Sequence, residues 1–299
     1  MLRSGGVVSG EIMKNDKDIL SVIEAAMGGF SKAQKKIAGY ILENYDKAAF
    51  MTAVRLARLA EVSESTVVRF AVELGYDGYP EMRRALQDMM RGKLTSVQRI
   101  KVAKDIMGSS DILMHVLSSD IDQIRNTMEE TNSGDFVRAV DAIVAAKNIY
   151  ILGLRSSSFL ANFMGYYFNL FFSNSRVVRE SPDSEVFEQM IRLTSDDVLI
   201  AISFPRYSRR TIKAMHYARD VGAKIIAITD GKSSPLFGLS DIPLCARSDM
   251  ISFLDTLVAP LSLVNALVVA VSEKAPGDLY ANFTRLESIW DEYGVYEQI

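Results

Sequence analysis

The sequence contains very little cysteine, histidine and tryptophan: one Cys, two His and one Trp among 299 residues. The single thiol, Cys245, excludes a disulfide framework and a cysteine-based metal site, and it fits a reducing compartment. The N-terminus has no continuous apolar segment of the kind found in a secretory signal. The longest apolar stretch, residues 257–271, contains Pro260 and Asn265 and falls short of the about 20 residues that a membrane span needs. We therefore expect a cytoplasmic protein without membrane contact, in which this stretch forms a buried helix.

Charge is distributed unevenly along the chain. Residues 31–104 hold 14 Lys and Arg against 8 Asp and Glu, a net charge of +6, whereas residues 105–299 hold 17 against 25, a net charge of −8. A basic surface attracts a polyanion, so this asymmetry favours a nucleic-acid partner for the first part only. Chance variation of solvated charge is the alternative explanation.

Apolar residues recur at helical spacing from residue 18 to about residue 91. Ser31, Thr52 and Ser63 are placed to cap three helices at their N-termini, and Gly75 is placed to end the third. The sequence therefore predicts an all-helical N-terminal domain. We expect a mobile tail over residues 1–17, this helical domain over 18–95 and a helical linker over 96–134.

The pattern of apolar residues changes from residue 135 on, where short apolar runs alternate with longer helical stretches. The runs are residues 148–153, 176–179, 198–203, 224–229 and 242–246. Such alternation is typical of βαβ units and a parallel sheet. Residues 135–299 are therefore predicted to form an α/β domain with a doubly wound parallel sheet.

The segment TAVRLARLAEVSESTVVRFAVEL, residues 52–74, has the pattern of two short helices joined by a tight turn. The apolar residues expected to form their shared core are Leu56, Ala57, Ala60, Val62, Val67, Phe70 and Leu74. This pattern predicts a helix-turn-helix, in which the second helix enters the DNA major groove. Glu61 occupies the turn position that many such motifs fill with Gly. An ordinary corner between two helices, without a DNA partner, is the alternative.

The residues expected to contact DNA are polar or basic. Arg69 is long enough for a bidentate contact to guanine, and short hydroxyls near it can reach phosphates or base edges. The candidates on the second helix are Ser63, Glu64, Ser65, Thr66 and Arg69. Candidates for the flanking phosphates, which contribute affinity but not sequence readout, are Lys35, Lys36, Arg55, Arg58, Arg83 and Arg84.

Three strings in this region, SKAQKKIAGYILEN, LARLAEVSESTVVRFAVELGYDGYP and EMRRAL, resemble the RpiR family of transcriptional regulators. The resemblance covers roughly residues 18–95. It implies a DNA-binding regulator of transcription whose partner is a double-stranded operator.

Two polar loops follow predicted strands: LRSSSFLA after residues 148–153 and FPRYSRRT after residues 198–203. In an open parallel sheet, ligands bind outside the carboxyl ends of the strands, and free N–H groups at helix N-termini favour an anion. Arg155 and Arg206 could each hold a phosphate or carboxylate as a planar fork. The expected ligand-binding residues are Gly153, Arg155, Ser156, Ser157, Ser203, Arg206, Tyr207, Ser208 and Thr211. Alternatively, the hydroxyls only cap helices.

Residues 108–275 resemble the SIS (sugar isomerase) domain, which follows the helix-turn-helix head in the RpiR family. Gly153, Ser156 and Ser157 match the first loop of that domain, and Ser203 and Ser208 match the ends of a Ser-x-Ser-Gly-x-Thr/Ser motif in the second. The resemblance implies a flavodoxin-like strand order and a phosphosugar ligand. Pro205 and Arg206 replace the middle Ser and the Gly, and this change also suits a smaller or non-phosphorylated acid.

A sugar-phosphate isomerase, or another enzyme with a SIS domain, is the alternative function. Isomerisation needs a general acid/base pair, but one His lies in the expected linker (His115) and the other about two turns into a helix (His216). Zinc-binding spacing, a P-loop and a nucleophile elbow are all missing from the sequence. We therefore expect a regulator that senses a small anionic metabolite, with no catalytic residues, no metal and no cofactor.

Two apolar helical segments suggest self-association. Residues 166–172 form an aromatic band, and residues 252–274 form a long apolar helix. Helix-turn-helix regulators bind two half-sites through a two-fold partner, so either segment is a candidate seam. Burial in the core of the domain is the alternative. We expect a homodimer or a tetramer.

Overall fold

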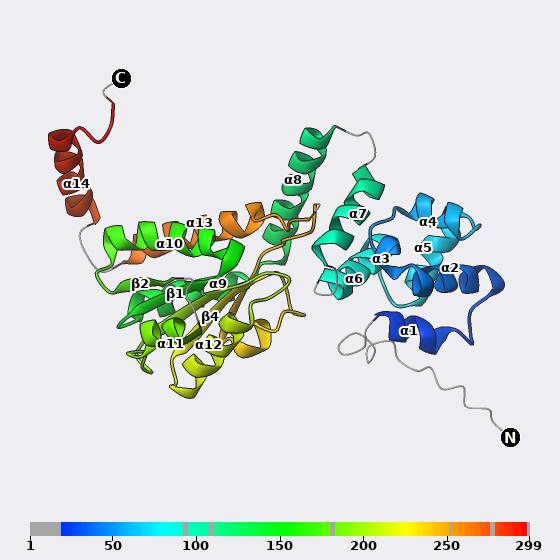
Figure 1. Cartoon of the computed structure of the whole chain (residues 1–299), viewed down its shortest axis with the longest axis horizontal. Coiled ribbons are helices and arrows are strands. Elements are labelled where there is room, and N and C mark those ends of the chain that lie inside the picture. The colour runs from blue at the N-terminus through cyan, green and yellow to red at the C-terminus, as the bar shows by residue number, and fades with distance from the viewer. Residues whose placement is uncertain are drawn as a thin grey trace. The chain divides into compact units, whose positions relative to one another are not determined.

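The structure is a computed structural model, and it describes residues 19–91, 95–107, 111–179, 183–251, 253–275 and 279–297 (Figure 1). The chain divides into two compact units between residues 110 and 111. The tail predicted over residues 1–17 lies outside the described residues. The linker predicted over residues 96–134 spans the division between the two units.

The N-terminal unit is entirely helical where it is described. Its helices are α1 (Ile19–Ala26), α2 (Lys32–Glu43), α3 (Tyr45–Ala48), α4 (Ala53–Leu59), α5 (Glu64–Glu73), α6 (Tyr79–Arg91) and α7 (Ser96–Met107). The predicted caps are confirmed: Ser31 forms a capping box with Gln34, and Thr52 accepts a hydrogen bond from the backbone N–H of Arg55 at 3.3 Å. Gly75 ends α5 with φ = 89°, a left-handed conformation that glycine adopts without steric cost.

The C-terminal unit contains a parallel five-stranded sheet in the order β2-β1-β3-β4-β5. The strands are β1 (Ile149–Gly153), β2 (Ser175–Val178), β3 (Val198–Ile202), β4 (Lys224–Thr229) and β5 (Ile242–Cys245). Each strand lies within one residue of its predicted range. The strand order is the flavodoxin-like order, so the predicted doubly wound fold is confirmed.

Helices cover both faces of the sheet. The helices of this unit are α8 (Ile112–Glu130), α9 (Ser133–Ala145), α10 (Ser158–Phe171), α11 (Asp183–Met190), α12 (Arg209–Asp220), α13 (Val258–Lys274) and α14 (Leu279–Tyr293), with short 3-10 helices η1 (Arg155–Ser157) and η2 (Phe237–Leu239). Apolar side chains of α9, α10 and α13 pack on one face, and those of α11 and α12 pack on the other (Figure 1). Both faces are buried, and therefore β1, β3 and β4 are almost wholly apolar.

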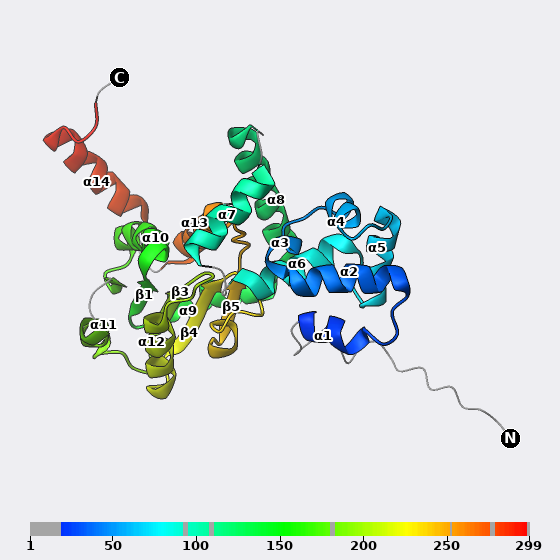
Figure 2. The ribbon, with the colours of Figure 1, turned by 45° about the vertical axis from the view of Figure 1, so that its right-hand side comes forward.

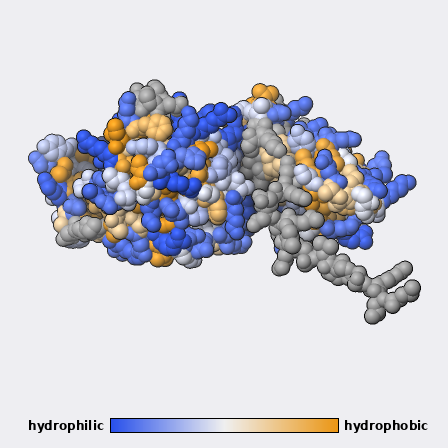
Figure 3. Space-filling model, turned by 90° about the horizontal axis from the view of Figure 1, so that it is seen from below, coloured by the Kyte–Doolittle hydropathy of each residue, from blue (hydrophilic) through white to orange (hydrophobic). Residues whose placement is uncertain are grey.

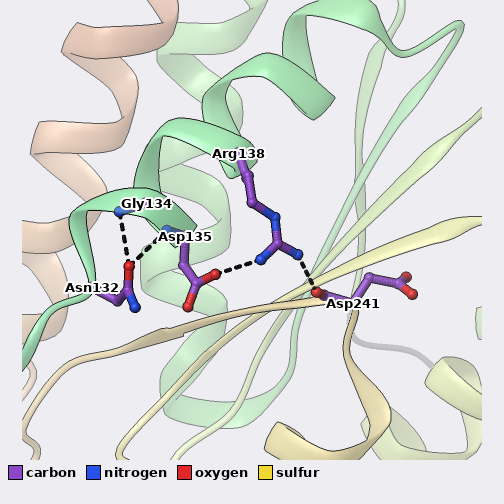
Figure 4. A network of polar contacts seen from close by, with 5 residues as sticks. All are labelled: Asn132, Gly134, Asp135, Arg138 and Asp241. Carbon is purple, nitrogen blue, oxygen red and sulfur yellow. Dashed lines mark hydrogen bonds and ion pairs between the residues drawn. The ribbon is translucent and has the colours of Figure 1, made fainter.

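A polar network joins α9 to the end of the sheet (Figure 4). The Asn132 side chain caps α9 by accepting hydrogen bonds from the N–H groups of Gly134 and Asp135, at 2.8 and 3.1 Å. Arg138 pairs with the Asp135 carboxylate at 2.7 Å and donates to the backbone oxygen of Asp241 at 2.8 Å. The network therefore connects the start of α9 with the turn that precedes β5.

Helix α8, which lies inside the predicted linker, is hydrogen-bonded within the C-terminal unit. The Gln123 side chain accepts from the N–H of Asp249 at 2.6 Å, and the Asp120 carboxylate accepts from the Thr256 hydroxyl at 2.7 Å. Arg247 adds an ion pair of 2.6 Å with Glu130. These polar residues of α8 thus bind the hairpin after β5, which contains Asp249 and Thr256.

The long apolar stretch predicted as a buried helix is α13. Its buried residues are Ala259, Pro260, Leu263, Val264, Leu267, Val268 and Val271, and the last five of them belong to the sheet-facing core. Among the described residues no single helix is long and apolar enough to cross a membrane, although α13 and α14 meet a length and composition test together as a bent pair. On the side where α11 and α12 lie, the surface is mostly hydrophilic with small separate apolar patches (Figure 3).

Candidate functional site

The core of the predicted helix-turn-helix forms between α4 and α5. Leu56, Ala57, Ala60, Val67 and Phe70 are buried, while Val62 and Leu74 are partly exposed. The ring of Phe30 packs on that of Phe70 with centroids 5.1 Å apart, which ties α5 to the segment before α2. Ser63 caps α5, because its hydroxyl accepts from the N–H of Thr66 at 3.3 Å. The local geometry of the motif thus agrees with the sequence pattern.

The turn between the two helices is closed by Glu61 in a left-handed conformation, with φ = 51°. The N–H of Val62 bonds to the carbonyl of Ala57 at 2.9 Å, and the N–H of Glu61 to that of Arg58 at 3.3 Å. This pair of bonds is the Schellman motif, in which Gly is usual at the left-handed position. The Glu61 carboxylate forms a 2.8 Å ion pair with Lys36 at the surface, and the hydrogen bond from Lys36 lowers the pKa of the Glu61 carboxyl.

Four of the five residues predicted to read DNA from α5 are exposed. Ser63, Glu64, Ser65 and Arg69 are open to solvent, and Thr66 is half-buried. The Ser63 hydroxyl lies 2.9 Å from that of Ser65 and 2.7 Å from that of Thr66. The start of α5 therefore presents a cluster of hydroxyls, with Arg69 one turn further along.

The predicted phosphate contacts come from three helices and differ in exposure. Lys35, Lys36 and Arg55 are exposed, whereas Arg83 and Arg84 are half-buried. Lys36 is engaged with Glu61, and the Arg83 Nε is buried without a hydrogen-bond partner among the described residues. Arg83 also lies beside the Tyr79 phenol, whose pKa burial raises to about 12. Arg83 is therefore less accessible to a DNA phosphate than the exposed candidates.

The two predicted ligand loops leave the sheet at neighbouring points. Gly153, the last residue of β1, is in register with Ile202, the last residue of β3. The chain after β1 continues into η1 and α10 on one face of the sheet, and the chain after β3 continues into α12 on the other. The strand order reverses between β1 and β3, so the loops flank the switch point at which ligands bind in such folds.

The first loop is tightly packed against β1. A Cβ atom on Gly153 would meet the Ser157 backbone oxygen at 2.4 Å and the Ala161 Cβ at 2.9 Å, so only glycine fits. Arg155 has φ = 56°, and its side chain is exposed. Ser157 is 4% exposed, whereas Ser156 is open to solvent. The loop thus combines one buried hydroxyl with one exposed hydroxyl and one exposed guanidinium group.

The second loop repeats this arrangement. Arg206 has φ = 67°, a left-handed conformation that favours glycine, and its side chain is exposed. The Ser203 hydroxyl accepts from the N–H of Ser208 at 3.3 Å, and Ser208 caps α12. Thr211 is fully buried in the first turn of α12, and its hydroxyl has no hydrogen-bond partner among the described residues.

Comparisons with known proteins agree with both halves of this architecture. Residues 17–93 match the helix-turn-helix domain of the rpiR family, and residues 142–270 match the SIS domain. The chain belongs to the RpiR-type transcriptional regulators. It is a transcriptional regulator with a SIS domain.

This RpiR-type regulator is similar to the HTH-type transcriptional regulator HexR of Pseudomonas aeruginosa, with 26% identity over 91% of this chain and 95% of the relative. Its fold is that of NanR from Vibrio vulnificus, solved in complex with ManNAc-6P (TM-score 0.56, 23% identity, 92% of this chain and 98% of that one). The sugar isomerase domain of an RpiR transcription factor from Sphaerobacter thermophilus also matches, with TM-score 0.55 and 25% identity over 58% of this chain and 97% of that one.

The sequence interpretation of this RpiR-type regulator missed a buried carboxylate beside the second loop. Asp230, directly after β4, is 4% exposed and accepts hydrogen bonds from the Tyr207 hydroxyl, at 2.9 Å to Oδ1 and 3.1 Å to Oδ2. The Thr229 hydroxyl bridges to the Ser203 backbone oxygen at 2.9 Å and to the Ser234 hydroxyl at 2.7 Å. The position of Asp230 at the carboxyl end of a predicted strand was the sequence feature that could have indicated it as a site residue.

The side chains considered as acid or base of an isomerase are not gathered beside the two loops in the described part of the regulator. His216 is exposed on α12 and His115 is exposed on α8. Glu180, which follows β2, lies outside the described residues. Within the described part of the chain, no group of three or more His, Cys, Asp or Glu side chains could hold a metal ion.

Proposed function

We propose that the regulator binds operator DNA through α5 and that an anionic metabolite, bound between residues 153–158 and 203–211, changes this affinity. The main support for the ligand site is the pair of loops at the switch point. Each loop has an exposed Arg in a left-handed conformation and is followed by a helix. The two helix N-termini and the two guanidinium groups favour an anion. A phosphosugar or a related acid is the proposed class of effector.

The metabolite is proposed to be sensed without being converted. Aldose–ketose isomerisation needs a positioned acid and base, whereas the carboxylate at this crevice, Asp230, is buried and held by Tyr207. The named relatives that span most of the chain are transcriptional regulators. Incubation with sugar phosphates, followed by NMR, should show no turnover.

The DNA-binding half of the proposal is tested on Arg69. Arg69→Ala should weaken binding to an operator from the regulator's own locus by about 1–3 kcal/mol and relax specificity at one base pair. Lys47→Ala removes an exposed cation outside the predicted contact set and serves as the control. Equal losses in both variants, or no binding by the wild type at low salt, would refute this role for α5.

The ligand half is tested on Arg206. A thermal-shift screen of acidic metabolites and sugar phosphates, including ManNAc-6P, identifies a compound that stabilises the C-terminal unit. An operator titration with and without that compound is then made on the wild type, Arg206→Ala and Lys213→Ala, which removes an exposed cation further along α12. Arg206→Ala should bind DNA normally and lose the response to the compound. A full response in Arg206→Ala would place the site elsewhere.

We further propose that the regulator acts as a homodimer or a tetramer. Support comes from the two-fold binding mode of helix-turn-helix proteins and from apolar side chains left exposed in the C-terminal unit. Of the two predicted seams, α13 is mainly core, whereas α10 exposes Phe159 (74%), Tyr166 (58%) and Tyr167 (37%). Light scattering on the full chain tests the assembly, and a monomer at micromolar concentration would refute it.

A further inference from the structure

Helix α8 has an exposed apolar row on the side away from the hairpin that holds it. The row consists of Met114, Leu117, Ile121, Ile124 and Met128, whose exposed fractions are 57%, 48%, 56%, 39% and 73%. Their spacing of 3, 4, 3 and 4 residues is the spacing of the a and d positions in a heptad repeat. In Figures 1 and 2 the N-terminal half of α8 stands clear of the helices that cover the sheet.

A polar side of the same helix binds the hairpin after β5. Asp120, Gln123, Thr127 and Glu130 repeat with the same spacing and hydrogen-bond to residues 247–256. These bonds fix the rotation of α8 about its axis, so the apolar row cannot turn into the core of its own unit. Ile112 and Leu113, each 65% exposed, add apolar surface at the N-terminal end of the helix. A stripe of apolar residues at a and d positions is the seam of a coiled coil, which takes another helix as its partner.

We propose that α8 pairs with α8 of a second copy of the chain, in an antiparallel coiled coil about a two-fold axis. The proposal rests on the homo-oligomer proposed above, and it assigns the two-fold interface to α8 rather than to the exposed side chains of α10. It assigns a role to a segment that the sequence alone marked only as a linker.

The charges of α8 favour its own second copy, turned end to end. Residues 112–119 contain no charged residue except His115, whereas residues 120–130 contain four carboxylates and one Arg. Parallel copies would bring the two acidic halves together. Antiparallel copies place each acidic half beside the uncharged half and the positive N-terminal end of the partner helix, an arrangement that electrostatics favours.

The hairpin bound to α8 also has exposed apolar side chains. Between its contacts at Asp249 and Thr256, this hairpin exposes Phe253 (58%) and Leu254 (46%). These two side chains belong to the hairpin side of α8, so the proposed pairing rests on the row alone.

The test changes the centre of the row in the full-length chain. Ile121→Glu introduces a charge that would be buried in the dimer, and it should raise the dimer dissociation constant about 100-fold or more. Because Ile121 is 56% exposed within one chain, the melting temperature of a forced monomer should stay close to that of the diluted wild type. Asn126→Glu adds the same charge to the same helix outside the row, and it should leave the mass measured by light scattering unchanged.

A thiol-protection measurement separates a second copy from any other cover. Ile121→Cys should react slowly with a maleimide at micromolar protein and quickly at nanomolar protein, because dilution separates the helices. Asp122→Cys, exposed and outside the row, should react quickly at both concentrations. Burial raises the pKa of the native Cys245 thiol to about 11, so this thiol contributes little signal.

Three results would overturn the proposal, each with a different meaning. A wild-type monomer would refute the assembly as well as its surface. A wild-type dimer that Ile121→Glu leaves intact would refute the α8 surface alone, and DNA binding measured in parallel would be untouched by that outcome. Slow maleimide reaction of Ile121→Cys at both concentrations would show that the row is covered within its own chain.

Discussion

Gly153 offers a direct test of how the first of the two loops proposed to bind the effector is built. Gly153→Ala would place a Cβ 2.4 Å from the Ser157 backbone oxygen and 2.9 Å from the Ala161 Cβ. The nearest atom belongs to the backbone, so β1 or η1 must move as a unit. Overpacking of this kind costs about 1–3 kcal/mol, and the lower entropy of the unfolded chain with Ala offsets about 0.4–1 kcal/mol of that. Because the clash of 2.4 Å is with a backbone atom, the overpacking cost lies at the upper end of its range, and we expect a net destabilisation of about 2 kcal/mol.

The assay is thermal unfolding of the full chain, followed by circular dichroism. For a unit of this size, about 2 kcal/mol corresponds to a fall of roughly 4–8 °C in the melting temperature of the C-terminal unit. Gly231→Ala is the matched control, because a Cβ there meets nothing within 4 Å. It should remain within about 0.5 kcal/mol of the wild type. If both variants melt like the wild type, the close approach of η1 to β1 does not exist.

Three further predictions concern buried or capping groups. Thr211→Val should raise stability in the absence of ligand by about 1 kcal/mol, because it removes a buried hydroxyl without a hydrogen-bond partner, and it should reduce stabilisation by the effector if that hydroxyl contacts the ligand. Ser63→Ala should cost about 1 kcal/mol through the lost cap of α5, whereas Ser65→Ala should cost less than half of that in the same denaturant titration. Burial, followed by the charge of Asp230, raises the pKa of Cys245 to about 11, so its alkylation at pH 8 should run roughly 100-fold slower than that of a free thiol and accelerate up to pH 11. A fast reaction at pH 8 would contradict this environment.

The sequence was sufficient wherever the deciding interactions are short in range. Ser63 bonds to a residue three positions away, and the turn at Glu61 is closed by bonds spanning three and five residues. A parallel sheet buried on both faces requires continuous apolar runs, so its strands were predictable to within one residue. The position of the two loops proposed to bind the effector followed from the rule that parallel strands end at one edge.

Tertiary structure decided the features that depend on residues far apart in the chain. Tyr207 meets Asp230 across 23 positions, and Gln123 of α8 meets Asp249 across 126. Periodicity describes which face of a helix is apolar but not what covers it: α13 turned out to be mainly core, whereas the row centred on Ile121 is left exposed. The sequence by itself therefore determined the elements, their caps and their order, because local bonds and burial patterns specify these. Only folding decided which polar groups meet and which apolar faces stay open, because these depend on how distant segments pack.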